Sequence, residues 1–502
     1  MKTSQLKLLN RTAAAVLAAV IKKHFPSAVL SGGGLTQIGF SYSFYLEEDQ
    51  KLSPVGFLQE QMEMYRLNDY PISFKEMVLS SLTGYLKHHN MSDRLEFLEL
   101  SKQVLYPVVE VDGFVDVMEG PFLKKTNDLR FFKLLDVARS AGGLYTIEGI
   151  ACNSKSELKE FLKKYKRYQT CNHMAIGLEK GFFDIADGEI VFLKKGLELK
   201  NRLSKFWKKS LIKNDFTIVE TSNDFEDQLK NKEINHKKLF EKSNEFFKKC
   251  AEQVTVVQKD LTGQDLFSIP TCNYFFESAF MLDEEVECFC NSSLQFIEKT
   301  LTILGFTYRI VLCQSAKKHL SKVEKSLKSF CENQLDYEIV RGEKLALQFQ
   351  LQDELGRWHK GPYLSFTKKG KMVEVARSSL GKLETAFALL LEKHQGKVPM
   401  ILSEEKLRII PLKNEFEAYA KSVAAIFWKQ GIEATIHLKK EELKKELFLA
   451  GMDEVSFVAV VGAKELQKKT VCLRNLLTDE EQTLSLEQLE NNLKLESYFE
   501  NK

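Results

Sequence analysis

The stretch that decides the fold reads Gly356-Arg357-Trp358-His359, followed by Val373-Glu374-Val375-Ala376-Arg377-Ser378-Ser379-Leu380-Gly381-Lys382-Leu383-Glu384-Thr385. The first part has the pattern of a hairpin strand. The second part runs from a strand through a glycine into the start of a helix. This order predicts a mixed domain in which a helix follows an antiparallel strand pair.

Composition sets the outer bounds on the rest of the chain. With 502 residues, 44% hydrophobic and 28% charged, the chain is an ordinary globular protein with room for about three domains. Its 72 Lys+Arg against 69 Asp+Glu leave a formal charge of +3, which neither demands nor excludes a nucleic-acid partner. The nine Cys include no CxxC pair, so we expect a reducing compartment and no disulfide framework or zinc ribbon.

The N-terminus has the outline of a signal peptide, because Lys2, Lys7 and Arg11 precede the apolar run 13–21. No small-residue cleavage site follows, and Lys22-Lys23-His24 continues the helix in polar register. We therefore expect a cytoplasmic protein rather than a secreted one. No apolar segment approaches the ~20 residues of a membrane span, so no membrane partner is expected.

The pattern along the chain predicts an α+β multidomain protein. Residues 1–150 combine a first helix with alternating strands, and Ser31-Gly32-Gly33-Gly34 predicts a turn between them. Residues 151–175 form a charged linker helix, and a second basic helix covers 194–213. Most such charge runs are solvated helix faces. From residue 406 strands alternate with helices, which is typical of a small α/β domain with a largely parallel sheet.

Three stretches resemble the threonyl-tRNA synthetase family in the same order. They are Arg11 to Leu17 with Gly39 to Tyr42, then Lys195-Gly196 with Phe206-Trp207 and the 373–385 segment, then Val461-Gly462 with Lys464-Glu465. The resemblance implies a degenerate editing-like domain at 1–150, a linker helix at 151–175, a class II synthetase catalytic-like domain with an antiparallel sheet at 176–400 and an α/β anticodon-binding-like domain at 401–502. The chain resembles a degenerate paralogue of the family that lacks the usual N-terminal ubiquitin-like domain.

Editing in that family uses a His-x-x-x-His pair with a Cys and another His to activate water against a mischarged ester. The matching positions hold Asn10, Ala14, Met118 and Phe122. None of these side chains can accept a proton from water near neutral pH. The resemblance therefore predicts that editing is lost.

Synthesis in the family needs a zinc ion held by one Cys and two His. Cys272 is the lone candidate for the Cys, and one His position holds Ala376. The other His would lie in a block that the resemblance places between Phe275 and Met281, where this sequence is too short to contain it. One thiolate alone does not make a zinc site, so no metal is expected.

The missing block would also carry the second class II motif, whose Arg holds the ATP α-phosphate. This chain has no Arg between Arg202 and Arg309, and the third-motif Arg position holds Thr385. A lysine lacks the planar fork that clamps a phosphate. ATP and zinc are therefore expected as cofactors only if the chain is a divergent active ligase.

Three readings follow from these losses. The first is a catalytically inactive synthetase-like protein kept for binding to tRNA or to protein. As a protein partner it would bind a second copy of itself, forming a homodimer, or an active threonyl-tRNA synthetase, forming a heterodimer. The second is a divergent active threonine–tRNA ligase that rebuilt ATP binding with lysines. The third is a tRNA-binding regulator whose contacts are Lys439, Lys440, Lys444 and Lys445, with phosphate attraction but weak base recognition.

Overall fold

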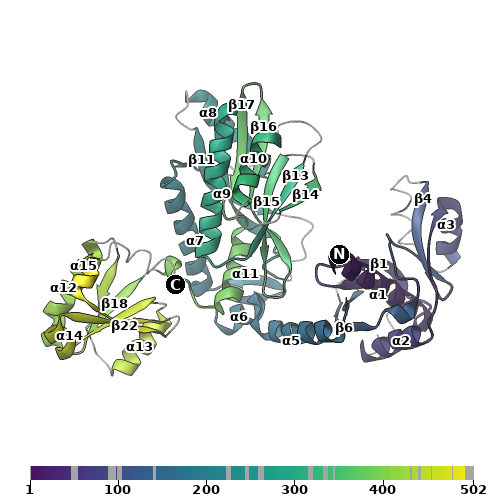
Figure 1. Ribbon diagram of the computed structural model, residues 1–502, viewed down its shortest axis with the longest axis horizontal. Helices are drawn as coiled ribbons and strands as arrows, with labels where there is room; N and C mark the ends of the chain where they lie inside the picture. The colour runs from purple at the N-terminus through teal and green to yellow at the C-terminus, as the bar shows by residue number, and fades with distance from the viewer. Residues whose placement is uncertain are drawn as a thin grey trace. The chain divides into compact units, whose positions relative to one another are not determined.

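The computed structural model describes residues 2–46, 55–88, 98, 104–139, 143–221, 228–243, 248–257, 265–314, 320–331, 337–342, 345–403, 405–429, 432–438, 442–453, 455–476 and 479–491 (Figure 1). The chain divides into two compact units, Met1–Tyr168 and Gln169–Lys502.

The first unit is built around helix α1 (Lys2–His24). A four-stranded antiparallel sheet has the order β1 (Val29–Leu35), β2 (Phe40–Tyr45), β7 (Leu144–Cys152), β6 (Phe131–Arg139). A second sheet pairs β3 (Ile72–Val78), β4 (Leu105–Val111) and β5 (Phe114–Val117), and helices α2 (Val55–Leu67) and α3 (Leu79–His88) complete the unit. Every residue from 12 to 21 is buried, so the apolar run of the N-terminus is core. In the described part of the chain, no helix has the length and apolar character needed to cross a bilayer.

The predicted turn at Ser31–Gly34 is wrong, because these residues lie inside β1. The strand pairs with β2 and has an irregularity between Leu30 and Gly32. A Cβ on Gly33 would lie 2.1 Å from the Tyr42 ring of β2. The glycines therefore let a buried aromatic ring pack against the neighbouring strand.

Two helices follow strand β7 along the chain. Helix α5 (Lys155–Cys171) has no buried residue, as expected of a charged linker. Helix α6 (His173–Glu179) begins at Asn172, whose side chain accepts a hydrogen bond from the Ala175 backbone N–H.

The catalytic-like domain contains an eight-stranded sheet. Its order is β10 (Thr217–Ile218), β11 (Lys249–Val257), β12 (Thr271–Leu282), β17 (Met372–Ser378), β16 (Trp358–Lys369), β15 (Leu345–Gln352), β13 (Tyr308–Gln314), β14 (Tyr337–Arg341). Only the two edge pairs, β10 with β11 and β13 with β14, are parallel. Strands β16 and β17 and helix α11 (Leu383–His394) confirm the hairpin and helix start predicted from residues 356–385.

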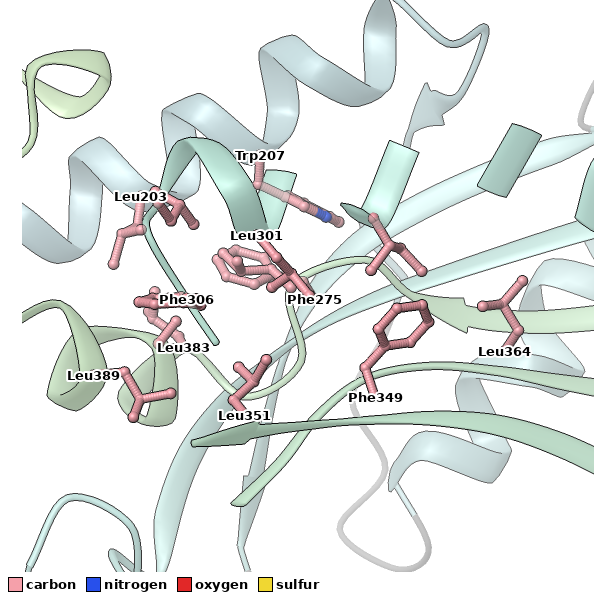
Figure 2. Packing of buried hydrophobic residues seen from close by; sticks show 14 of the residues in the cluster. Leu203, Trp207, Phe275, Leu301, Phe306, Phe349, Leu351, Leu364, Leu383 and Leu389 are labelled. Carbon is pink, nitrogen blue, oxygen red and sulfur yellow. The ribbon is translucent and has the colours of Figure 1, made fainter. Parts of the chain in front are cut away.

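One face of this sheet carries the hydrophobic core. Helices α7 (Lys194–Ile212), α9 (Val286–Ile303), α10 (Leu320–Cys331) and α11 contribute to it. Figure 2 shows its centre, with Trp207 of α7 beside Phe275 of β12, and with Leu301, Phe349, Leu351 and Leu364 around them. Strand β15 alternates between buried and half-buried residues, as expected when one face of a sheet is packed and the other is not.

Strand β12 is unbroken from end to end. It pairs with β11 from Thr271 to Ala279 and with β17 from Glu277 to Leu282. Phe275 and Met281, between which the resemblance placed a missing block, both face the core from one continuous strand rather than forming the two sides of a shortened loop. Short hairpin strands β8 (Phe183–Ala186) and β9 (Glu189–Phe192) and helix α8 (Gln228–Lys242) complete the domain.

The C-terminal domain contains a five-stranded sheet of order β19 (Ala434–Ile436), β18 (Leu407–Pro411), β20 (Phe457–Val461), β21 (Thr470–Asn475), β22 (Glu481–Ser485). Its helices are α12 (Glu417–Lys429), α13 (Leu443–Met452), α14 (Ala463–Lys468) and α15 (Leu486–Asn491). Strand β18 is parallel to both its neighbours, but β20 to β22 pair antiparallel. The α/β prediction is confirmed, whereas the sheet is mixed rather than largely parallel.

The carboxylate of Glu277, in the middle of β12, should be essential for the stability of the catalytic-like domain. It accepts hydrogen bonds from Trp207 Nε1 at 2.9 Å and from the Ser379 backbone N–H at 3.0 Å, and it pairs with the buried Arg377 guanidinium. Glu277→Gln leaves that guanidinium without a charge partner, and we expect a loss of about 3–5 kcal/mol in unfolding free energy. Urea unfolding checks this against Glu284→Gln, which changes an exposed carboxylate nearby and should have little effect.

Candidate functional site

The second face of the eight-stranded sheet is the candidate site, and we call it the site face. Alternate residues of β12, including Cys272, Phe276 and Ser278, point to it, since Phe275 and Ala279 belong to the core on the other side. Ser278 lies directly opposite Ala376 of β17. Helix α8 covers the β11 and β12 part of this face, with its His236 ring beside Phe276 at 5.5 Å between centroids.

The position of the expected zinc-binding His is filled by apolar packing. Ala376 is 8% exposed and forms a small cluster with Val254 and Phe276, with Tyr363 packed against it. A methyl group at this place offers no electron pair to a metal. The site face is therefore hydrophobic where the resemblance implied an imidazole.

The lone cysteine candidate is buried and lies far from Ala376. Cys272 is fully buried, and its thiol approaches the Val256 carbonyl oxygen at 3.7 Å. Burial raises the pKa of Cys272 to about 11, so it is a neutral thiol at pH 7 and a poor metal ligand. Ser278, opposite Ala376, is six residues further along the strand, or about 20 Å at the usual rise. The structure thus does not bring these two predicted positions together.

Two further observations concern the predicted cofactor positions. Across the described residues, no group of three His, Cys, Asp or Glu side chains could hold a metal ion. Thr385 lies in the first turn of α11 and is 5% exposed, within a helix whose residues 383–392 are all buried. It adds no positive charge to the site.

A buried polar network that the sequence analysis missed joins α8 to the site face. Glu252 of β11 accepts from Lys232 Nζ at 3.1 Å, and its other oxygen lies 3.0 Å from His236 Nε2. The second ring nitrogen, Nδ1, is 2.9 Å from the Ser278 hydroxyl. Thr221 also donates to Glu252, through its backbone N–H at 3.0 Å and its hydroxyl at 2.9 Å. The signal in the sequence was the spacing of Lys232 and His236, one helical turn apart.

The charges of this network balance inside the protein. Lys232 and Glu252 are both 2% exposed, so the ammonium offsets the carboxylate where water cannot. Burial by itself would raise the pKa of Glu252, but hydrogen bonds from His236, Thr221 and Lys232 outweigh it and hold that pKa below its ordinary value. The network fastens α8 to the sheet.

The four predicted editing positions have structural partners instead of catalytic ones. The Asn10 amide bridges α1 to β7, because Nδ2 donates to the Ala151 carbonyl oxygen at 2.9 Å and Oδ1 accepts from its N–H at 2.8 Å. Ala14 and Met118 belong to one hydrophobic cluster, and Phe122 packs against it and against Phe74. The structure therefore brings these positions together as core.

Two of the four predicted RNA-binding lysines lie in the first turn of α13. Lys444 and Lys445 are exposed on this helix. Lys439 and Lys440 lie outside the described residues. Phe448, one turn further along, is 66% exposed, and His437 pairs with the buried Glu446 at 3.3 Å.

Comparisons with known proteins show what this chain is similar to. Residues 406–496 match the family model described as an anticodon binding domain. The threonine–tRNA ligase of Acetivibrio thermocellus is 21% identical over 537 residues, covering 93% of this chain and 85% of that protein. That of Clostridioides difficile is 24% identical over 542 residues, covering 93% and 84%. A solved structure of the RNA binding domain of threonyl-tRNA synthetase from Cryptosporidium parvum covers 64% of this chain and 98% of its own at 20% identity, with a TM-score of 0.49.

The mixed α/β domains and the family match define a multidomain protein with an anticodon-binding domain. Together with this match, the alignment with threonine–tRNA ligases over more than nine-tenths of the chain supports a protein of the threonyl-tRNA synthetase family.

The thiol of Cys272 should be inert and indifferent to zinc. With a pKa of about 11, its thiolate fraction at pH 7.5 is about 100-fold below that of an ordinary cysteine, and burial limits access further. Iodoacetamide labelling followed by mass spectrometry should modify the exposed Cys288 much faster. Protection of Cys272 by added zinc would contradict the absence of a metal site.

Glu252→Gln tests the network under α8. The variant leaves Lys232 buried without a counter-charge, and we expect a loss of about 3–5 kcal/mol in unfolding free energy at pH 7. The pKa of Glu252 is lower in the folded chain than in the unfolded chain, so its contribution is complete above the ordinary value of 4.5 and is lost as pH falls through the folded value. The stability gap between wild type and variant should therefore narrow below pH 4.5.

Urea unfolding across pH 3–7 measures this gap. Glu241→Gln removes an exposed carboxylate from the same helix and serves as the control. A gap that stays constant down to pH 3 would show that the Glu252 charge does not stabilise the fold.

Proposed function

We propose that this protein is inactive in both aminoacylation and editing and is kept in the cytoplasm for binding, with tRNA as its first partner. The observation that carries the proposal is the apolar packing of Ala376. In addition, Cys272 lies ~20 Å along β12 from Ser278, the residue opposite Ala376. Zinc needs three or four ligands within about 2 Å, and this arrangement supplies none at Ala376.

The nucleotide side of the site supports the same conclusion. No Arg occurs between Arg202 and Arg309, and Thr385 is buried and uncharged. Guanidinium contacts to a transferring phosphate contribute several kcal/mol to such transition states. Editing lacks a base, because Asn10 uses both ends of its amide to hold β7. No cofactor is therefore expected.

Binding to tRNA is supported by the anticodon-binding domain at residues 406–496 and by the exposed Lys444 and Lys445 on α13. Lysines attract phosphates without reading bases, so weak discrimination among tRNAs is expected. A homodimer, or a heterodimer with an active threonyl-tRNA synthetase, is the protein partnership we propose.

A divergent but active threonine–tRNA ligase is the second candidate. It is favoured by the full-length alignment with threonine–tRNA ligases. It would need a new clamp for the ATP phosphates. Lys200 and Lys382 lie near the start of α11, but Lys200 is engaged by Glu384 at 2.9 Å, and Lys382 donates to the carbonyl oxygens of Phe267 and Ile269.

The deciding experiment measures three activities and one affinity on the same preparation. Threonine-driven ATP–pyrophosphate exchange, charging of tRNA-Thr and deacylation of mischarged Ser-tRNA should all equal a buffer blank, with an active threonyl-tRNA synthetase as positive control. Binding of tRNA should be detectable by fluorescence anisotropy. ATP–pyrophosphate exchange above the blank would establish the active ligase instead. Absence of any tRNA binding would contradict the tRNA-binding function and leave binding to a protein partner.

A further inference from the structure

Strand β3 is the outer strand of the three-stranded sheet in the first unit. The backbone N–H of Ile72, at its start, points away from β4, because it donates to the Lys124 carbonyl oxygen at 2.9 Å. Backbone groups alternate in direction along an antiparallel strand, so those of Phe74 and Glu76 face the same outer side. In the described part of the chain, no backbone hydrogen bond from outside the sheet reaches these two residues.

This edge lacks the features that usually protect an exposed strand. The pairing with β4 is regular over all seven residues of β3, so the strand has no bulge. The strand contains no proline, and its one lysine, Lys75, is engaged by Glu110 of β4 at 2.5 Å. A strand edge without a proline, a bulge or an unpaired lysine is a template for a further strand.

One face of the sheet carries apolar side chains beside this edge. Phe74 is 48% exposed and Val78 43%, and Leu105, directly opposite Val78 on β4, is 47% exposed. The Phe74 ring packs against Phe122 with centroids 5.6 Å apart, which holds it in position. We call Phe74, Val78 and Leu105 the β3 apolar stripe. Neighbouring exposed apolar side chains of this kind mark a binding surface.

Glu76 lies between Phe74 and Val78 on the same face, since alternate residues of a strand share a face. It is exposed, and it has no ion pair among the described residues. A strand added at the edge would place one residue directly opposite Glu76, with the two Cβ atoms ~5 Å apart. Opposite charges in such a pair stabilise a sheet and like charges destabilise it. The edge therefore favours a strand with a basic residue between two apolar ones.

A second copy of β3 fits this edge poorly. When two identical antiparallel strands pair with their faces aligned, one residue must lie opposite its own copy. Full overlap places Lys75 opposite Lys75, and a shift by one residue toward the C-terminal end places Glu76 opposite Glu76, so like charges meet. A shift the other way needs the Ile72 N–H, which Lys124 already occupies. The partner is therefore a different sequence.

We propose that the β3 edge binds an extended segment of another protein, in which a lysine or arginine stands between two apolar residues on one face of the added strand. Backbone hydrogen bonds with Phe74 and Glu76 hold the segment, as in other cases of strand addition. The β3 apolar stripe covers its apolar side chains, and Glu76 pairs with its cation. This surface is separate from the anticodon-binding domain and does not depend on tRNA binding.

Two fluorescent synthetic peptides test the proposal by anisotropy with the full chain. Both carry threonines on one face of the strand, and on the other they carry isoleucine–lysine–isoleucine or isoleucine–glutamate–isoleucine. The lysine peptide should bind about fivefold more tightly than the glutamate peptide, because it places an opposite charge against Glu76. The variant Glu76→Lys should reverse this order.

Glu76→Pro tests the backbone contact. It removes an N–H that faces the outer side and leaves the pairing with β4 intact, so it should abolish binding of both peptides with an unchanged circular dichroism spectrum. Glu76→Gln removes the charge alone and should bind both peptides equally. The control Glu60→Gln, at an exposed carboxylate of α2, should behave as wild type. If the proline variant fails to fold, the reversal by Glu76→Lys still decides the outcome.

The proposal is overturned if the wild-type chain binds no lysine peptide. It is also overturned if wild type and Glu76→Lys bind both peptides equally. Self-association of the wild-type chain that Glu76→Pro abolishes, measured by sedimentation, would assign the edge to a second copy and contradict the proposed partner.

Discussion

The carboxylate of Glu277 is the interaction on which the catalytic-like domain depends. It sits in the middle of β12 and is fully buried, yet it joins three elements that are distant in the sequence. Trp207 reaches it from α7, Arg377 from β17, and Ser379 from the turn that leads into α11. Arg377 in turn donates to Ser293 of α9 at 2.9 Å. A buried charge of this kind is tolerated only when every partner is in place, so the network selects one register for the sheet.

The two faces of that sheet have separate roles. One face and its helices form a dense core around Trp207, Phe275 and Phe349. The other face is well packed where it is described, with Ala376 in an apolar cluster and Cys272 protonated in the interior. The core is built from apolar side chains on the opposite face, so its packing does not depend on the groups of the site face. In the first unit, Asn10 and Ala14 likewise have structural partners, because Asn10 donates to the Ala151 carbonyl oxygen and Ala14 is buried in the core.

Helix α8 covers the β11 and β12 part of the site face. It carries a lysine and a histidine onto a single buried glutamate, and Phe240 stacks on Phe280 at 4.8 Å beside them. Polar groups satisfied in this way fix the position of the helix, because any displacement would leave buried charges without partners. The covering of β11 and β12 is therefore a property of the fold itself.

The sequence by itself determined which side chains stand at the expected positions and much of the architecture. A fold cannot supply a side chain that the chain lacks, so the loss of histidines and arginines at the expected positions was readable without coordinates. Periodicity also predicted the hairpin and helix at 356–385, the linker helix and the α/β character of the last domain, because local patterns reflect which face of an element is buried. Only the tertiary structure decided that Cys272 and Ala376 lie apart, that Glu277 and Glu252 are network centres, and that Ser31–Gly34 is strand. These properties depend on strand register and on contacts between residues distant in the chain, which local sequence patterns do not contain.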